Sequence, residues 1–174
     1  YLGVAYADEG IALRKGGISL PIMVMNADQA SFYSITEYNL QPVLYSFEIL
    51  HQFERHVSSM GLLNYPVHLE VETGMNRLGF ALRDIEALGQ YLKHNTCMAV
   101  ESVFSHLAAS EDPAQDAFTQ QQATLFQEAA STLEEALSYS FLKHFSNSAA
   151  IVRYPNFQWD MVRLGIGIYG VEIA

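Results

Sequence analysis

Two segments of this sequence place basic side chains where a polar ligand could bind. VETGMNRLGF carries Arg77 in a loop that follows an apolar run, and FSHLAASED carries His106 in the same position relative to another run. A guanidinium can bind a carboxylate through two parallel hydrogen bonds, and a histidine can donate or accept one near neutral pH. Each could equally be ordinary, with Arg77 solvated and His106 structural. No spacing among Cys97 and the six histidines is that of a metal site.

Residues toward the end of the chain have the chemistry of a phosphate site. Asn147 and Ser148 follow an apolar run and precede a helical pattern, so they offer a hydroxyl, free N–H groups and the positive end of a helix dipole. Gly165 and Gly167 interrupt the last apolar run, which indicates close approach to the backbone. With Arg163 beside them, they predict a phosphate cradle. Neither segment matches a P-loop or a GxGxxG motif, and Asn147 alone could be a simple helix cap.

The segment Val67–Glu72 alternates between apolar and polar residues. Its apolar side chains point to one side, and His68, Glu70 and Glu72 point to the other. If this strand is buried, its carboxylates need partners, because an unpaired buried charge costs several kcal/mol. Arg77 and Arg163 are the natural partners. The alternative is an exposed edge strand with a solvated polar face.

The elements that must position these residues alternate between strands and helices. Apolar residues recur at helical spacing over Glu48–Met60, which Gly61 would end, and over Asp116–Leu137. The short apolar runs between such segments predict seven strands, at Leu2–Tyr6, Ile22–Met25, Pro42–Tyr45, Val67–Glu72, Met98–Phe104, Phe141–Phe145 and Met161–Ile168. Alternation of this kind indicates a parallel sheet with about six helices. No composition break divides the chain, so we expect one domain.

Two parallel architectures compete for this pattern. An open doubly wound sheet is ordinary at 174 residues, whereas a (β/α)8 barrel usually needs about 250 and would be incomplete. Polar residues cluster just after the apolar runs, and in a barrel all such strand ends share one rim, where ligand sites form. Polar strand-to-helix loops are common in any fold, but the clustering favours the barrel. We therefore predict a partial TIM barrel that lacks its first strand.

Composition narrows the class of protein further. Nine Lys and Arg oppose 19 Asp and Glu, and half of the residues are apolar, which predicts a packed core and argues against nucleic-acid or anionic-membrane binding. The sequence contains no run of 18 apolar residues, so we expect no membrane span. One cysteine, Cys97, fits a reducing cytoplasm. Because the first residue is Tyr1, we expect this chain to be a piece of a longer polypeptide.

The motifs together resemble one enzyme family. LGVAYADEGIALRKGGI, HLEVETGMNRLGF, FSHLAASEDP and HFSNSAAI…DMVRLGIGIYG occur in the order found in bacterial alanine racemases. These are pyridoxal-phosphate (PLP) enzymes with an N-terminal barrel and a C-terminal β-domain. The last segment is also similar to racemase modules fused to a cell-wall ligase. The resemblance implies that residues 1–174 form an incomplete PLP-binding barrel domain and that the β-domain is absent.

The resemblance also implies a role for each matching residue. Cofactor binding falls to His106, Asn147, Ser148, Arg163, Gly165 and Ile166, and substrate binding or support to Glu70, Met75 and Arg77. Ser148 and the backbone of Gly165 and Ile166 would hold the phosphate. Arg163 would face the pyridine nitrogen, and His106 would orient Arg163. Because a guanidinium only donates, that nitrogen would stay unprotonated and withdraw fewer electrons.

Several family residues have no match or a changed match here. The PLP-anchoring lysine precedes the first residue of this chain, and the second proton-transfer residue, a tyrosine, belongs to the missing β-domain. We therefore expect no acid/base catalytic residue in this chain and no activity from it in isolation. Many relatives have a lysine, sometimes carbamylated, where Glu70 stands, so we hypothesise that Glu70 supplies that anion and positions Arg77. Glu72 replaces the usual aspartate.

The resemblance implies a PLP-dependent parent enzyme that interconverts L-alanine and D-alanine for peptidoglycan synthesis, as a cytoplasmic homodimer. Two alternatives remain. One is a non-catalytic PLP-binding barrel protein of cofactor homeostasis. The other is a broad-specificity amino-acid racemase or decarboxylase on the same scaffold.

Overall fold

The computed structural model describes residues 1–171, which fall into two compact units. The first unit contains Tyr1–Leu69 and His94–Glu101, and the second contains Glu70–Lys93 and the residues from Ser102 onward. Strands β4 (Tyr65–Glu72) and β6 (Met98–Phe104) each contribute residues to both units.

Alternating strands and helices build the first unit. Its elements are β1 (Leu2–Val4), α1 (Ala7–Lys15), β2 (Ile22–Val24), α2 (Phe32–Glu37), β3 (Gln41–Leu44), α3 (Phe47–Ser59) and the beginnings of β4 and β6. Its strands pair in parallel, with Gly3 opposite Met23 and Val43 opposite His68. Helix α3 begins where the Ser46 hydroxyl accepts a hydrogen bond from the Ile49 N–H, 3.3 Å away.

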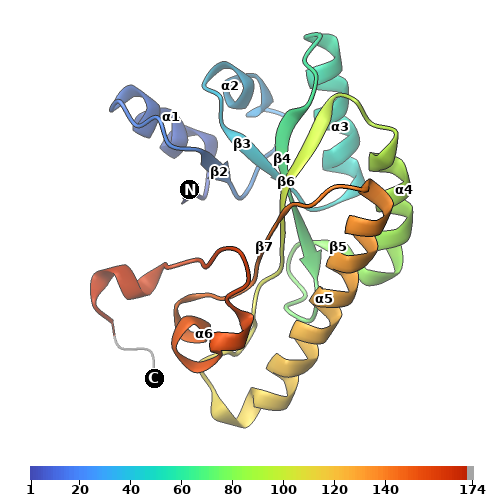
Figure 1. Ribbon diagram of the computed structural model, residues 1–174. Coiled ribbons are helices and arrows are strands. Elements are labelled where there is room, and N and C mark those ends of the chain that lie inside the picture. Colours follow the sequence, from blue (N-terminus) through green and yellow to red (C-terminus); the bar gives the residue numbers. More distant parts are fainter. Residues whose placement is uncertain (172–174) are drawn as a thin grey trace. The chain divides into compact units, whose positions relative to one another are not determined.

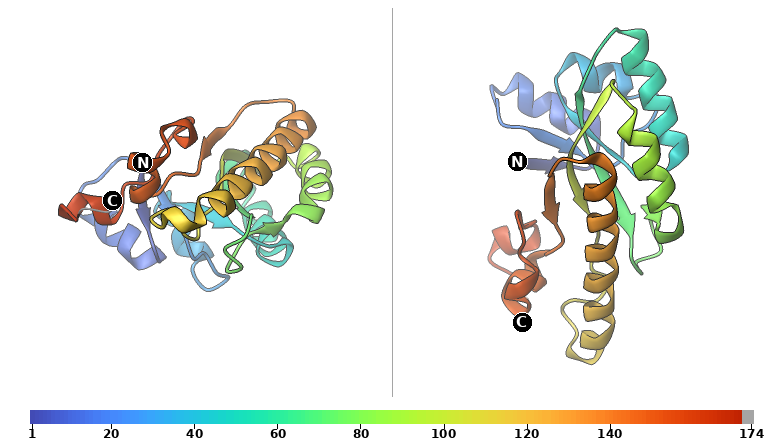
Figure 2. Two further views of the ribbon diagram at one scale, coloured as in Figure 1. Left: turned by 90° about the horizontal axis from the view of Figure 1, so that it is seen from below. Right: turned by 45° about the vertical axis from the view of Figure 1, so that its right-hand side comes forward.

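The second unit contains the remaining elements (Figure 1). They are the ends of β4 and β6, β5 (Phe80–Ala81), α4 (Ile85–Lys93), α5 (Asp116–Leu137), β7 (Leu142–His144), α6 (Ser148–Arg153) and short 3-10 turns. Helices α4 and α5 lie side by side (Figure 2). They approach so closely that a Cβ on Gly89 would lie 2.7 Å from the Ala136 Cβ.

An aromatic cluster fills the core of the second unit. Phe126 of α5 stacks on Phe145, with ring centroids 5.3 Å apart, and Trp159 contacts both rings. Phe126 and Phe145 are fully buried. Large buried aromatic rings contribute much of the apolar burial that stabilises a core, so this cluster anchors the segments on either side of β7.

The fold class is confirmed as a partial (β/α)8 barrel of parallel strands with helices between them. The hydrogen-bonded strand order is β1-β2-β3-β4-β6-β7, with β5 beside β4. The predicted bounds of Met98–Phe104 and Asp116–Leu137 are reproduced without change.

The predicted last strand, Met161–Ile168, is wrong. Met161 makes one isolated bridge to His144, and Ile166–Tyr169 form a 3-10 turn. The N–H groups of Gly165 and Gly167 bond the Ser148 hydroxyl and not a neighbouring strand, so no ladder continues there. The two-residue strand β5 was not predicted because two residues give no periodic pattern.

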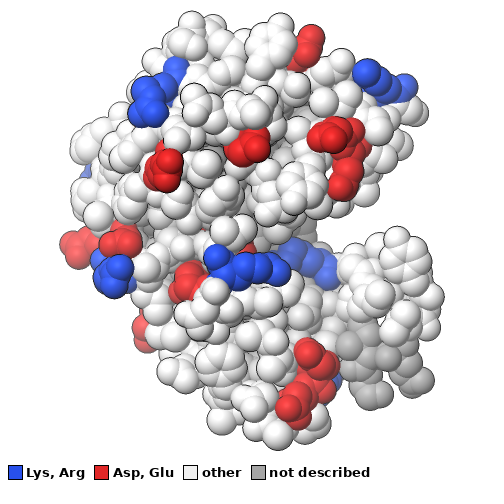
Figure 3. Space-filling view, turned by 180° about the vertical axis from the view of Figure 1, so that it is seen from behind, with Lys and Arg blue, Asp and Glu red and all other residues white. Residues whose placement is uncertain are grey.

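The described helices include none with the length and apolarity needed to cross a membrane. On the face drawn in Figure 3, Lys and Arg side chains lie scattered among acidic ones.

Candidate active site

Arg163 lies at the centre of a hydrogen-bond cluster in the second unit. Its Nη1 donates to the Nδ1 and the carbonyl oxygen of His144, at 3.1 and 3.0 Å. Its Nη2 donates to the carbonyl oxygens of Ser105 and Phe145, at 2.7 and 3.2 Å. The guanidinium carbon also lies 5.0 Å from the centre of the Phe104 ring, within cation–π range. The end of β6 and the end of β7 therefore hold this side chain in one orientation.

The same guanidinium fixes the protonation of two histidines. Its Nη2 lies 3.5 Å from His106 Nδ1, and its Nη1 bonds His144 Nδ1. Because a guanidinium has no acceptor, both Nδ1 atoms must be unprotonated, and a neutral ring then carries its proton on Nε2. His144 Nε2 lies 2.9 Å from the Ser102 hydroxyl oxygen, which can accept a hydrogen bond from the Nε2–H group.

Burial and charge set the ionisation of this cluster. Burial, together with the charges of Arg163 and Arg77, lowers the pKa of His106 to about 4. Burial also lowers the pKa of Arg163 to about 10, against the opposing effect of Glu70. At neutral pH, His106 is therefore neutral and Arg163 remains a cation.

Glu72 holds the loop that carries Met75 and Arg77. One carboxylate oxygen accepts a hydrogen bond from the Gly74 N–H, and the other accepts from the Arg77 N–H at 3.3 Å. Gly79 closes the loop so tightly that a Cβ there would lie 2.6 Å from the Glu72 nitrogen. Met75 is half-buried and the Arg77 side chain is exposed, so a cation is presented at the loop's tip.

Glu70 is buried within electrostatic range of both arginines. Its side chain is 3% exposed, which rejects the solvated edge strand as an interpretation of this segment. Burial raises the pKa of the Glu70 carboxyl, while Arg77 and Arg163 lower it and Glu72 raises it. Among these described residues, Glu70 forms no ion pair within 4.0 Å with either arginine. The backbone contact at Arg77 comes from Glu72, and the positioning role of Glu70 stays a prediction.

Ser148 gathers backbone donors at the start of α6. Its Oγ accepts hydrogen bonds from the N–H groups of Gly165 and Gly167, at 3.0 and 3.2 Å, with Ile166 between them. Asn147 is the N-cap, since its Oδ1 accepts from the Ala150 N–H at 3.0 Å. These residues thus form one small polar cluster, as the sequence predicted, but through a 3-10 turn and not a strand.

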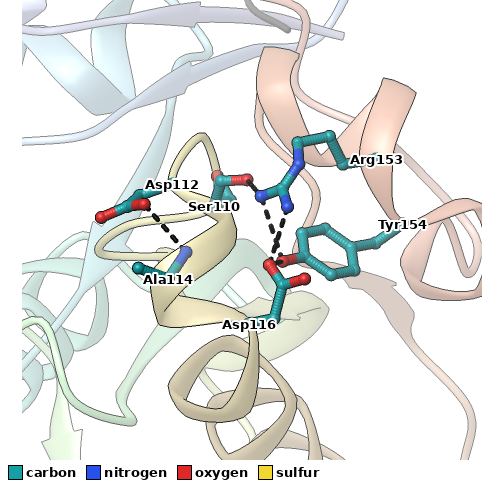
Figure 4. A network of polar contacts seen from close by, with 6 residues as sticks. All are labelled: Ser110, Asp112, Ala114, Asp116, Arg153 and Tyr154. Carbon is teal, nitrogen blue, oxygen red and sulfur yellow. Dashed lines mark hydrogen bonds and ion pairs between the residues drawn. The ribbon is translucent and has the colours of Figure 1, made fainter.

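A second polar network fixes α6 against α5 (Figure 4). Asp116 accepts hydrogen bonds from Arg153 Nη2 at 2.7 Å and from the Tyr154 hydroxyl at 2.5 Å. Arg153 Nη1 donates to the Ser110 carbonyl oxygen at 2.6 Å, and the Ser110 hydroxyl donates to Asn147 Oδ1 at 2.9 Å. The network therefore reaches the residue that precedes Ser148.

The surroundings of the three lysines differ from the Arg163 and Ser148 clusters. Lys143 Nζ pairs with the Glu134 carboxylate at 3.0 Å, and Lys15 Nζ lies 5.8 Å from the centre of the Tyr38 ring. Lys93 is exposed at the end of α4. Of the residues that bond Arg163, His144 was not predicted from the sequence, although a histidine inside an apolar strand was a visible signal.

Comparison with known proteins identifies the family of this chain. The sequence profile described as "Alanine racemase, N-terminal domain" matches residues 1–173. This chain belongs to the alanine racemase N-terminal domain family. An alanine racemase of Symbiobacterium thermophilum is 33% identical over 175 residues, which cover 100% of this chain and 46% of that protein. The alanine racemase of Clostridium tetani is 35% identical over 172 residues, covering 97% of this chain and 44% of that protein.

Solved structures of the family superpose on the alanine racemase domain described here. The alanine racemase of Clostridium difficile 630 in complex with cycloserine is 30% identical, with a TM-score of 0.92, and the match covers 100% of this chain and 48% of that one. The alanine racemase of Bartonella henselae, solved with covalently bound pyridoxal phosphate, is 23% identical with a TM-score of 0.85 over 98% of this chain and 48% of that one, and supports the fold. The chain spans about half the length of these relatives.

Proposed function

We propose that this chain forms the cofactor cradle of a PLP-dependent alanine racemase. One observation carries the proposal: the Arg163–His106 contact and the Ser148 cluster lie in the same compact unit of a chain that belongs to this family. These are the residues that the resemblance assigns to the ring and to the phosphate of the cofactor.

The donor set fits such a cofactor. A phosphate dianion needs several hydrogen-bond donors. The N–H groups of Gly165 and Gly167, which donate to Ser148 Oγ in this structure, would turn to the phosphate together with the Ser148 hydroxyl. A Cβ on Gly167 would lie 2.9 Å from Leu164 Cδ1 and 3.5 Å from Ser148 Oγ, so this turn leaves little room for a side chain at that position. Ser148 and the Gly165–Gly167 backbone would thus hold the phosphate.

Bound PLP would supply the electron withdrawal that makes the Cα proton of alanine removable. The chain's own residues would tune and orient that chemistry. Arg163 keeps its protons, so it would present only donors to the pyridine nitrogen and leave that nitrogen unprotonated. Neutral His106 accepts from Arg163 and so orients it without adding a positive charge. Arg77, at the tip of its loop, would attract the substrate carboxylate.

The remaining parts of the proposal concern the whole enzyme. The groups that move protons, a lysine and a tyrosine, would come from sequence outside the matched region, because none of the three lysines here lies in the matching motif. We further propose that the enzyme works in the cytoplasm as a homodimer and supplies D-alanine for peptidoglycan. The single half-buried thiol of Cys97 supports the cytoplasmic location.

The test is a titration of the complete gene product, freed of cofactor, with PLP. Ser148→Ala removes one hydroxyl of the cradle, and a lost hydrogen bond to a charged group should raise the Kd for PLP about tenfold or more. Ser131→Ala, on an exposed position of α5, is the matched control and should leave the Kd unchanged. The wild type should interconvert L- and D-alanine. Absence of racemisation, or equal Kd values for the two variants, would overturn the proposal.

A further inference from the structure

Gln122 is a fully buried amide in the middle of α5, far along the sequence from the residues that it contacts. Its Nε2 donates to the Thr73 hydroxyl at 3.3 Å and to the His106 carbonyl oxygen at 3.1 Å. Its Oε1 accepts from the Ala108 N–H at 3.1 Å. Glutamine at such a site costs free energy unless its polar atoms are paired, and here both donors and the acceptor have partners.

These three bonds join two segments that carry site residues. Thr73 begins the loop that bears Met75 and Arg77, and His106 and Ala108 belong to the segment that follows β6. Thr73 adds a direct link, because its hydroxyl lies 2.7 Å from that of Ser105.

The Arg77 loop also sits directly on α5. A Cβ on Gly74 would lie 2.7 Å from Phe118 Cζ and 3.4 Å from Gln122 Cγ, so the loop backbone packs against the helix side chains. Gly74 has a φ of 141°, which only glycine adopts readily. Helix α5 is therefore a surface on which the loop is seated, and Gln122 is its polar attachment point.

We propose that Gln122 is a positioning residue that fixes the Arg77 loop relative to His106, and so sets how well the enzyme binds the carboxylate of its substrate. The inference rests on the proposed function only for the identity of that substrate. Among the described residues, the hydrogen bonds of Gln122 do not include Ser148, Gly165 or Gly167, so the affinity of that cluster for PLP should not depend on this amide.

The test compares Gln122→Met with Gln121→Met in the complete gene product. Methionine matches glutamine in length but cannot make these hydrogen bonds, and Gln121 is the exposed neighbour on the same helix. In hydrogen exchange, peptides covering residues 73–77 and 105–110 should exchange about tenfold faster in Gln122→Met, while those covering 148–153 should not change. The KM for L-alanine should rise about tenfold, with the Kd for PLP within about twofold of wild type. Gln121→Met should match the wild type throughout.

A purely structural role predicts something different. Gln122→Met would then melt at a lower temperature but leave the exchange at 73–77 and the KM unchanged, and this result would overturn the inference. If Gln122→Met does not fold, Thr73→Val removes one partner of the amide and should raise the KM and the exchange at 73–77; an unchanged KM there would equally overturn it. Failure of the proposed function would show in the wild type itself, whereas the exchange contrast between the two glutamine variants decides this inference.

Discussion

Replacing Arg163 by lysine tests whether the guanidinium organises the site. Arg163 makes two hydrogen bonds through Nη1 and three through Nη2. Lysine keeps the charge but has a single nitrogen at the end of an unbranched stem, so it cannot reach the acceptors that the two Nη atoms of arginine reach. We expect at least two of the five bonds to be lost. At the lower end of the range for bonds to charged groups, about 1.5 kcal/mol each, Arg163→Lys should destabilise the protein by about 3 kcal/mol.

The assay is urea unfolding at pH 7.5 of protein purified without added PLP. The control is Arg83→Lys, because the Arg83 side chain is 87% exposed and lies 3.9 Å from Asp84. Such an exposed pair contributes about 0.5 kcal/mol or less, so this variant should unfold like the wild type. If Arg163→Lys also stays within about 0.5 kcal/mol of the wild type, the cluster around the guanidinium does not hold the two strand ends together.

Three further predictions concern pH, α6 and helix packing. The folded pKa of His106, about 4, lies below its unfolded value, so the unfolded state binds more protons at this residue between about pH 6.5 and 4. The contribution of His106 to stability should be complete above that window and fall as the pH drops through it. In urea unfolding measured against pH, His106→Gln should therefore lose less stability across the window than the wild type. Asp116→Asn should lower the melting temperature slightly and weaken the dependence of that temperature on salt, because Arg153 loses its carboxylate partner; an unchanged salt dependence would contradict this. Gly89→Ala should destabilise by about 1–3 kcal/mol despite better helix propensity, since the new Cβ meets Ala136, and the added change Ala136→Gly should restore stability.

The sequence predicted most of the fold because long elements have clear periods. Asp116–Leu137 repeats its apolar residues over six turns of helix, and the run Met98–Phe104 is bounded on both sides, so both ranges could be read directly. The segment Met161–Ile168 has the apolar composition of a strand, but its N–H groups bond a hydroxyl that is 17 and 19 residues away in the chain. The composition of the segment does not indicate that the Ser148 hydroxyl takes the N–H groups that a neighbouring strand would otherwise bond.

The site was predictable to the extent that its residues lie in local motifs. Arg163, His106 and Ser148 each stand in a recognisable segment, and the structure brings Arg163 to His106 and Ser148 to the glycines. Gln122 could not be found in this way, since nothing in a helical pattern distinguishes it from the exposed Gln121 beside it. A long-range hydrogen bond can be predicted from the sequence only when the residue type is unusual for its local secondary structure.

The cap of α6 shows why the choice between two similar side chains matters. Aspartate would accept the Ala150 N–H as well as Asn147 does, and it caps helices equally well. It would also place a full negative charge next to Ser148, where a doubly charged phosphoryl group is proposed to lie, and like charges at that spacing repel. An amide provides the same acceptor oxygen while staying neutral. Asn147 therefore stabilises the start of α6 without adding a negative charge that would repel a bound phosphate.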